Sequence, residues 1–123
     1  DTPPLLSQTD LDGLEQACGS AVSATELLQC DFLFFETAAG SDQEAFGASC
    51  GGTVTGANGT CGTTAASGST ISALVSSCGS DDNAACDELF IVTPVGSKLE
   101  LFGSTCGGRS RTELDGACVT QLG

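Results

Sequence analysis

The acidic side chains and the cysteines are the residues of this chain that could do chemistry. The sequence has 16 Asp and Glu residues, 8 Cys and 3 Lys or Arg, but no His. Without His, a nucleophile of the Ser-His or Cys-His type lacks its usual base, and Lys98 is the only amine side chain. Carboxylate catalysis would need a pair such as Glu44 and Glu100, but each follows a Ser by three residues and is explained by helix capping. We therefore expect a protein that is not an enzyme.

The same side chains offer little to a metal. Zinc sites need closely spaced cysteine pairs or histidine, and the sequence has neither. Calcium prefers oxygen ligands, so Asp81, Asp82 and Asp87 form a weak calcium candidate. Their spacing is not that of an EF-hand loop, and helix capping explains Asp81 and Asp82. We expect no metal and no cofactor.

The cysteines belong to a segment that the chain contains twice. Cys30–Gly52 aligns without a gap to Cys86–Gly108, and more than half of the positions are identical. Outer cysteines frame both copies: Cys18 and Cys61 in the first, Cys78 and Cys118 in the second. Internal repeats indicate a duplicated structural unit. Units this small usually need disulfides to be stable, and disulfides form in oxidising compartments. The sequence thus predicts a secreted or extracytoplasmic chain.

Capping and stop signals predict three helices in each unit. The expected starts are Thr9 or Asp10, Ser23 and Ser41 in the first unit, and Ser69 or Thr70, Asp81 or Asp82, and Ser97 in the second. The fold prediction is therefore all-α: a small, disulfide-rich tandem repeat of two three-helix units. Residues 1–8 are expected to be linker, residues 9–66 the first unit and residues 67–123 the second. The Pro-rich start at Asp1 suggests a processed or excised ectodomain.

Two nested disulfides are expected in each unit. Gly40 lies midway between Cys30 and Cys50, so an antiparallel helix hairpin would bring these two cysteines together. The same argument pairs Cys86 with Cys106. The outer pairs would then be Cys18–Cys61 and Cys78–Cys118, although spacing alone leaves the two other connectivities of each unit open.

Two further pairs of residues stand out when the copies are compared. Asp31 and Asp87 recur directly after a cysteine, and we expect them to stabilise the start of a helix or to bind nearby backbone amides. Phe32 and Phe35 replace Glu88 and Ile91 of the second copy and make their helix apolar on more than one face. The favoured interpretation is a seam between the units, and the alternative is a binding patch for a partner.

The segment Cys86–Arg109 resembles a four-cysteine segment of actinobacterial extracytoplasmic proteins, which include lipoproteins, membrane proteins and receptor-like kinases. The shared pattern reads C-D-x-L-F-x-x-T-P-V-G-S-x-x-E-x-F-G-x-T-C-G-G-R. The first copy departs from it at Ala38-Ala39, which replace Pro-Val, and at Thr53, which replaces Arg109. The resemblance implies an actinobacterial secreted or cell-envelope module, and it offers no catalytic residue.

The net charge of −13 limits the classes of partner. It disfavours nucleic acids and anionic membranes, and no apolar run is long enough to span a bilayer. A cationic protein or envelope component fits this charge best. We therefore expect a non-enzymatic extracytoplasmic binding or sensing module. The alternatives are a structural spacer or adhesive unit of a surface protein, and a secreted hydrolase inhibitor.

Overall fold

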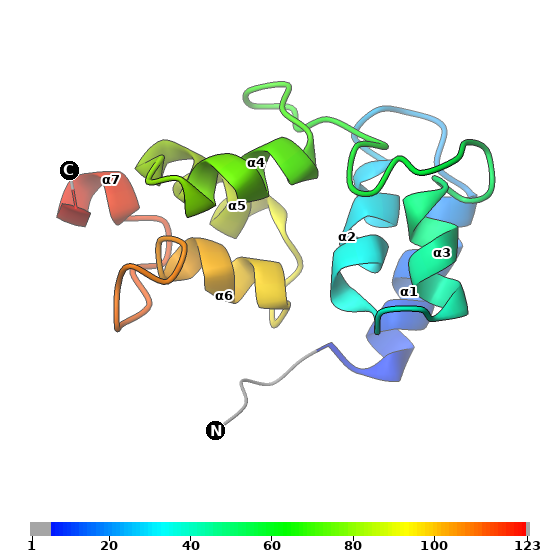
Figure 1. Ribbon diagram of the computed structural model, residues 1–123, viewed down its shortest axis with the longest axis horizontal. Coiled ribbons are helices and arrows are strands. Elements are labelled where there is room, and N and C mark those ends of the chain that lie inside the picture. The colour runs from blue at the N-terminus through cyan, green and yellow to red at the C-terminus, as the bar shows by residue number, and fades with distance from the viewer. Residues whose placement is uncertain (1–5, 123) are drawn as a thin grey trace. The chain divides into compact units, whose positions relative to one another are not determined.

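The computed structural model describes residues 6–122, and all regular secondary structure within them is helical (Figure 1). The seven helices are α1 (Gln8–Gly19), α2 (Leu28–Glu36), α3 (Asp42–Ala48), α4 (Ile71–Gly79), α5 (Asn83–Val92), α6 (Lys98–Ser104) and α7 (Cys118–Leu122). The chain divides into two compact units, the first ending at Ser72 and the second beginning at Ala73. None of the described helices is long and apolar enough to cross a membrane. The predicted all-α, disulfide-rich class is confirmed.

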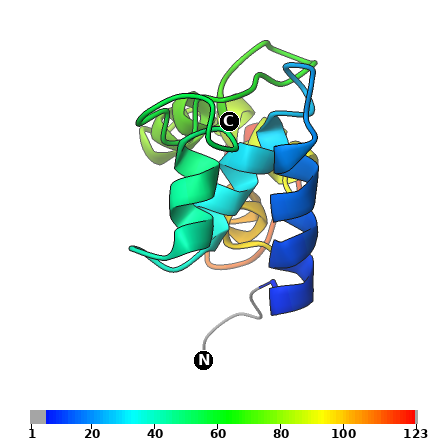
Figure 2. The same cartoon turned by 90° about the vertical axis from the view of Figure 1, so that its right-hand side faces the viewer.

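Helix α2 is the centre of the first unit, and α1 and α3 both pack against it (Figure 2). Its buried side chains include Leu28, Phe32 and Leu33. Gly47 of α3 lies directly against the α2 backbone, because a Cβ at this position would stand 2.6 Å from the Cys30 carbonyl oxygen. The lack of a side chain at Gly47 therefore lets the two helices approach closely.

The second unit repeats the close contact between two helices. Helix α6 packs against α5, and a Cβ at Gly103 would stand 2.7 Å from the Cys86 carbonyl oxygen. The short helix α7 also packs on α5. The expectation of three helices is therefore wrong for this unit, which has a fourth after the turn at Asp115 and Gly116. A helix of five residues has too few apolar positions to show a period in the sequence.

The predicted capping of α3 and α6 is confirmed, with one change in its geometry. Ser41 Oγ accepts from the Glu44 N–H at 3.1 Å, and Ser97 Oγ accepts from the Glu100 N–H at 3.0 Å. Each glutamate then accepts from the glycine before the serine, Gly40 or Gly96, at 2.8 and 2.9 Å. The capping glutamates thus hold the turn of each hairpin as well as the helix start.

Helix α1 begins earlier than the sequence suggested. Its N-cap is Ser7, not Thr9 or Asp10, and Ser7 and Asp10 form a reciprocal capping box. The expected linker at residues 1–8 therefore wrongly includes Ser7 and Gln8, which cap and begin α1. Residues 1–5 of that linker lie outside the described chain.

The cap at Ser23 also forms, but α2 begins only at Leu28. The Ala24 carbonyl accepts from the Thr63 N–H at 3.1 Å, whereas the Leu28 N–H donates to Thr25. Gly62 lies against the same turn, since a Cβ there would stand 2.3 Å from the Ala24 oxygen. The Ser23 carbonyl still accepts from the Leu27 N–H at 2.9 Å, so the returning chain takes the second acceptor of the expected α-helix and the turn continues with i→i+3 bonds.

The predicted disulfide pairing is wrong in both units. The bonds are Cys18–Cys30, Cys50–Cys61, Cys78–Cys86 and Cys106–Cys118, so none of the nested pairs Cys18–Cys61, Cys30–Cys50, Cys78–Cys118 and Cys86–Cys106 occurs. Each bond instead joins cysteines that follow one another along the chain, with sequence separations of 12, 11, 8 and 12.

The reason lies in what each helix of the hairpin must hold. Cys30 does start the hairpin and Cys50 does follow its end, but the two helices are already held together by the contact at Gly47. Cys30 bonds outward to the last turn of α1, and Cys50, in a left-handed conformation with φ 55°, bonds to the loop that follows. The disulfides thus attach the flanking segments to the hairpin.

Candidate functional site

The two recurrent aspartates occupy equivalent places in the two units. Asp31 Oδ1 accepts from the Cys61 N–H at 2.9 Å, and its Oδ2 accepts from the Gly62 N–H at 3.0 Å. Asp87 accepts from the Cys118 and Val119 N–H groups at 2.7 and 3.1 Å. Each carboxylate therefore fixes the backbone at the last cysteine of its unit. The prediction that they bind backbone amides is confirmed, although those amides lie about thirty residues further along the chain.

Asp31 is fully buried, and this burial changes its acidity. Desolvation raises the pKa of the Asp31 carboxyl group, while the hydrogen bonds from Cys61 and Gly62 act in the opposite direction. The group is therefore part of the core of the first unit. Asp87 is only half-buried.

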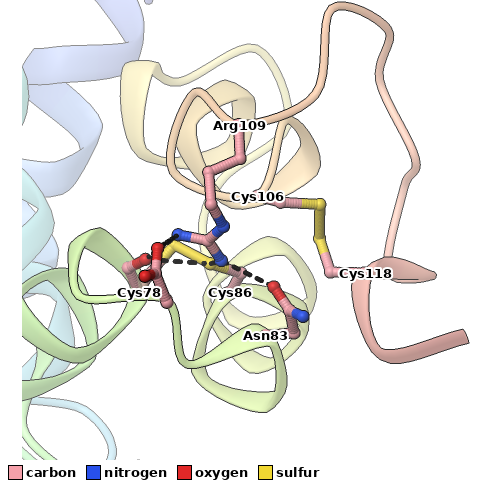
Figure 3. Close-up of polar contacts among 7 residues, drawn as sticks. Cys78, Asn83, Cys86, Cys106, Arg109 and Cys118 are labelled. Carbon is pink, nitrogen blue, oxygen red and sulfur yellow. Dashed lines mark hydrogen bonds and ion pairs between the residues drawn. A yellow bond between two sulfur atoms is a disulfide. The ribbon is translucent and has the colours of Figure 1, made fainter. Parts of the chain in front are cut away.

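Arg109 makes several polar contacts within the second unit (Figure 3). Its Nη1 donates to the Cys78 carbonyl at 2.8 Å and lies 3.1 Å from Asp81 Oδ1. Its Nη2 donates to Asn83 Oδ1 at 2.6 Å and lies 3.7 Å from Cys86 Sγ. The planar guanidinium thus joins the end of α4 to the start of α5 beside their disulfide. In the first unit Thr53 stands at this place in the repeat, and its hydroxyl donates to the Cys50 carbonyl at 3.0 Å.

The three calcium candidates have separate structural partners. Asp81 pairs with Arg109, Asp82 caps α5 by accepting from the Ala85 N–H at 3.2 Å, and Asp87 holds Cys118 and Val119. Within residues 6–122, no three carboxylate or thiol side chains lie close enough to bind one metal ion. Each carboxylate is thus accounted for by a contact within the chain.

The two partner-binding candidates do not form an exposed pair. Phe32 is buried, with 3% of its surface exposed. Phe35 is half-buried, makes an edge-to-face contact with Phe34 at 5.0 Å, and lies where a Cβ on Gly59 would stand 2.7 Å from its ring. Both rings therefore serve the packing of α2 in this structure.

All eight cysteines are bonded in disulfides, as described above. A thiol nucleophile or a metal-binding thiolate would require a reduced chain. Four disulfides fit an oxidising environment.

Two features of the structure go beyond the sequence predictions. The first is that one turn recurs before the last cysteine of each unit. Asn58-Gly59, where the Asn-Gly pair predicts a turn, and Asp115-Gly116 all have left-handed φ values, between 49° and 94°. In the second unit, buried Ser104 donates to Asp115 at 2.6 Å and thereby holds this turn. An Asx-Gly pair three and two residues before Cys61 and Cys118 was the signal that could have revealed it.

The second feature is a cavity of the first unit that is open to solvent, between the end of α1 and the approach to α2. Its volume is about 360 Å³, and it is lined by Ala17, Ser20, Ala21, Thr25, Glu26 and Gln29. Glu26 Oε1 accepts from the Val22 and Ser23 N–H groups at 2.9 and 3.1 Å. These hydrogen bonds, from Val22 first, lower the pKa of Glu26 and keep it ionised.

Comparison with known proteins gave no match to this chain, whether to a family model, to a curated protein or to a solved structure.

Proposed function

We propose that this chain is a non-enzymatic binding or sensing module of an actinobacterial secreted or cell-envelope protein. The side chains best suited to chemistry have structural partners. Asp31 and Asp87 hold backbone amides, Arg109 joins two helices, and the cysteines are bonded to one another. The four disulfides support an oxidising location, and the resemblance of Cys86–Arg109 supports the envelope assignment.

The observation that carries the proposal is the charge of the surface. Exposed carboxylates occur in both units, at Asp10, Asp12, Glu26, Asp42, Asp81, Asp82, Glu113 and Asp115, against a total of three Lys and Arg residues. Such a surface attracts cationic partners at long range, and the attraction weakens as salt screens it. We therefore infer that the partner is a basic protein or envelope component.

The test is a binding experiment with the oxidised chain immobilised and an actinobacterial envelope extract applied at low salt. The proposal predicts a captured component that, once purified, binds saturably and is released as salt rises. A variant with Asp42→Asn and Glu113→Gln should bind it more weakly, because both residues are exposed carboxylates. Weaker binding of this variant would distinguish charge-dependent recognition from non-specific adsorption through apolar surface.

Two results would overturn the proposal. A chain that binds nothing saturably at low salt would favour the spacer or adhesive unit instead. Inhibition of a purified secreted hydrolase with a defined stoichiometry would favour the inhibitor.

A further inference from the structure

The cavity of the first unit lies in the segment where the two copies differ most in length. The disulfide Cys18–Cys30 spans a sequence separation of 12, whereas its counterpart Cys78–Cys86 spans 8. Ser20, Ala21, Thr25, Glu26 and Gln29, five of the residues that line the cavity, fall within this longer segment. The cavity therefore lies where the first unit has four more residues than the second.

Glu26 is the charged group of this hollow, and its position is fixed. Its Oε1 takes both backbone hydrogen bonds, from Val22 and Ser23, and the return bond from Glu26 N–H to Ser23 Oγ measures 3.1 Å. Both of these backbone hydrogen bonds go to Oε1, so neither uses the second carboxylate oxygen. Among the described residues, the half-buried side chain of Gln29 has no hydrogen-bond partner. A carboxylate and a carboxamide are therefore both available at the cavity.

The second unit shows what such a pair can bind. There the guanidinium of Arg109 contacts the carboxylate of Asp81 and the carboxamide oxygen of Asn83 (Figure 3). Glu26 and Gln29 carry the same two functional groups, each on a side chain one methylene longer. The first unit has no Lys or Arg of its own, since all three lie between Lys98 and Arg111. The two side chains are therefore complementary in charge and hydrogen bonding to a guanidinium group.

We propose that the cavity lined by Glu26 and Gln29 binds an arginine side chain of a basic protein partner. The planar guanidinium would donate to the Glu26 carboxylate and to the Gln29 carboxamide oxygen, and its aliphatic stem would lie against Ala17 and Ala21. This inference rests on the proposed binding function and assigns one contact within it. The remaining exposed carboxylates would supply the long-range attraction.

The test uses the full oxidised chain and an uncharged glycine-serine peptide that carries one central arginine. Backbone amide shifts are followed by NMR as the peptide is added. Matched peptides with lysine or with citrulline, the neutral analogue of arginine, are the ligand controls. Glu26→Gln is the decisive variant, because its Oε1 still accepts from Val22 and Ser23 and so retains the loop. Gln29→Ala tests the second contact, and Glu113→Gln is the control for net charge.

We expect saturable shifts confined to residues 17–29 for the arginine peptide and weaker binding of both control peptides. Glu26→Gln should weaken binding about fivefold, the upper range for one exposed charge pair. Glu113→Gln should weaken it less than about twofold, because it removes one charge of the acidic surface outside the cavity. Shifts spread over exposed carboxylates of both units, equal for lysine and unaffected by Glu26→Gln, would overturn the cavity assignment but agree with the proposed acidic binding surface. A complete lack of shifts would also overturn the assignment, while the envelope-binding experiment tests the proposed function independently.

Discussion

Replacing Asp31 by Asn tests the aspartate that fixes the last cysteine of the first unit. Both oxygens of Asp31 accept backbone hydrogen bonds, from Cys61 at 2.9 Å and from Gly62 at 3.0 Å. Asparagine has one oxygen acceptor, so its NH₂ group must face a backbone N–H and one buried donor is left without an acceptor. A buried donor without a partner costs about 1–3 kcal/mol.

Part of this loss is recovered, because burial disfavours the ionised form of Asp31 and asparagine carries no charge. We therefore expect Asp31→Asn to lower the free energy of unfolding by about 1–3 kcal/mol, a large part of the roughly 5–15 kcal/mol typical of small proteins. Asp87→Asn should cost less, about 0.5–1.5 kcal/mol, because Asp87 is only half-buried and one of its two partners, Val119, is exposed.

The assay is urea unfolding of the oxidised protein followed by circular dichroism, with hydrogen exchange of the Cys61 and Gly62 amides as a local measure. Exchange at these two amides should accelerate in Asp31→Asn. Glu113→Gln, an exposed loop carboxylate, should change stability by less than about 0.5 kcal/mol. An Asp31→Asn variant as stable as wild type, or a larger loss for Asp87→Asn than for Asp31→Asn, would refute the reasoning.

Three further predictions follow from the contacts described above. The raised pKa of Asp31 means that the folded chain keeps this proton at pH values where the unfolded chain, with a pKa of about 3.9, has lost it. The difference in unfolding free energy between wild type and Asp31→Asn should therefore be largest at low pH and should decrease as pH rises through the folded pKa. An increase of this difference with pH in parallel urea titrations would contradict the prediction. Gly47→Ala and Gly103→Ala should each lower the free energy of unfolding by about 1–3 kcal/mol, because the new Cβ would lie 2.6 or 2.7 Å from a cysteine carbonyl oxygen of the facing helix. Gly13→Ala, with open space around it in α1, should instead raise this free energy by about 0.5–1 kcal/mol. Equal shifts of the melting temperature for the three variants would count against the close helix contacts. Arg109→Lys should destabilise the second unit by about 1–2 kcal/mol, because an ammonium group does not reproduce the two contacts of the guanidinium to Cys78 and Asn83. Hydrogen exchange of the α4 and α5 amides measures this effect. Exchange rates equal to those of wild type would show that these contacts contribute nothing.

Much of the fold could be predicted from local signals. The capping serines at positions 41 and 97 and the recurrence of the same residues in two copies indicated the helix hairpins, and the hairpins are found. Local signals succeed here because a cap and its helix lie within one turn of each other.

The disulfide pairing could not be predicted in the same way, because it depends on how the flanking segments meet the hairpin. The midpoint argument placed Cys30 and Cys50 at the same end of the hairpin, but it ignored the glycine contact that already joins the two helices. Cys30 faces α1 and Cys50 faces the following loop, and neither direction is fixed by spacing alone. The late start of α2 has a similar cause, since Thr63 takes the Ala24 carbonyl from a distant part of the sequence.

The candidate site was only partly visible in the sequence. Asp31 and Asp87 were identified from their recurrence, and binding to backbone amides was expected, but not the identity of those amides. The cavity was missed because most of its lining lies between Cys18 and Cys30, where the first copy is longer than the second and the two copies cannot be aligned without a gap. The structural role of Arg109 had a signal, since it is one of three cations in the chain, but its partners lie in helices far from it in sequence.

The most direct test of the structure is a disulfide map of the unreduced protein. Digestion with an Asp- and Glu-specific protease and then with a protease of low specificity, followed by mass spectrometry of the linked peptides, identifies each bond. The account predicts Cys18–Cys30, Cys50–Cys61, Cys78–Cys86 and Cys106–Cys118. Peptides that link Cys30 to Cys50 or Cys86 to Cys106 would contradict it, and with it the placement of both aspartates and of the cavity.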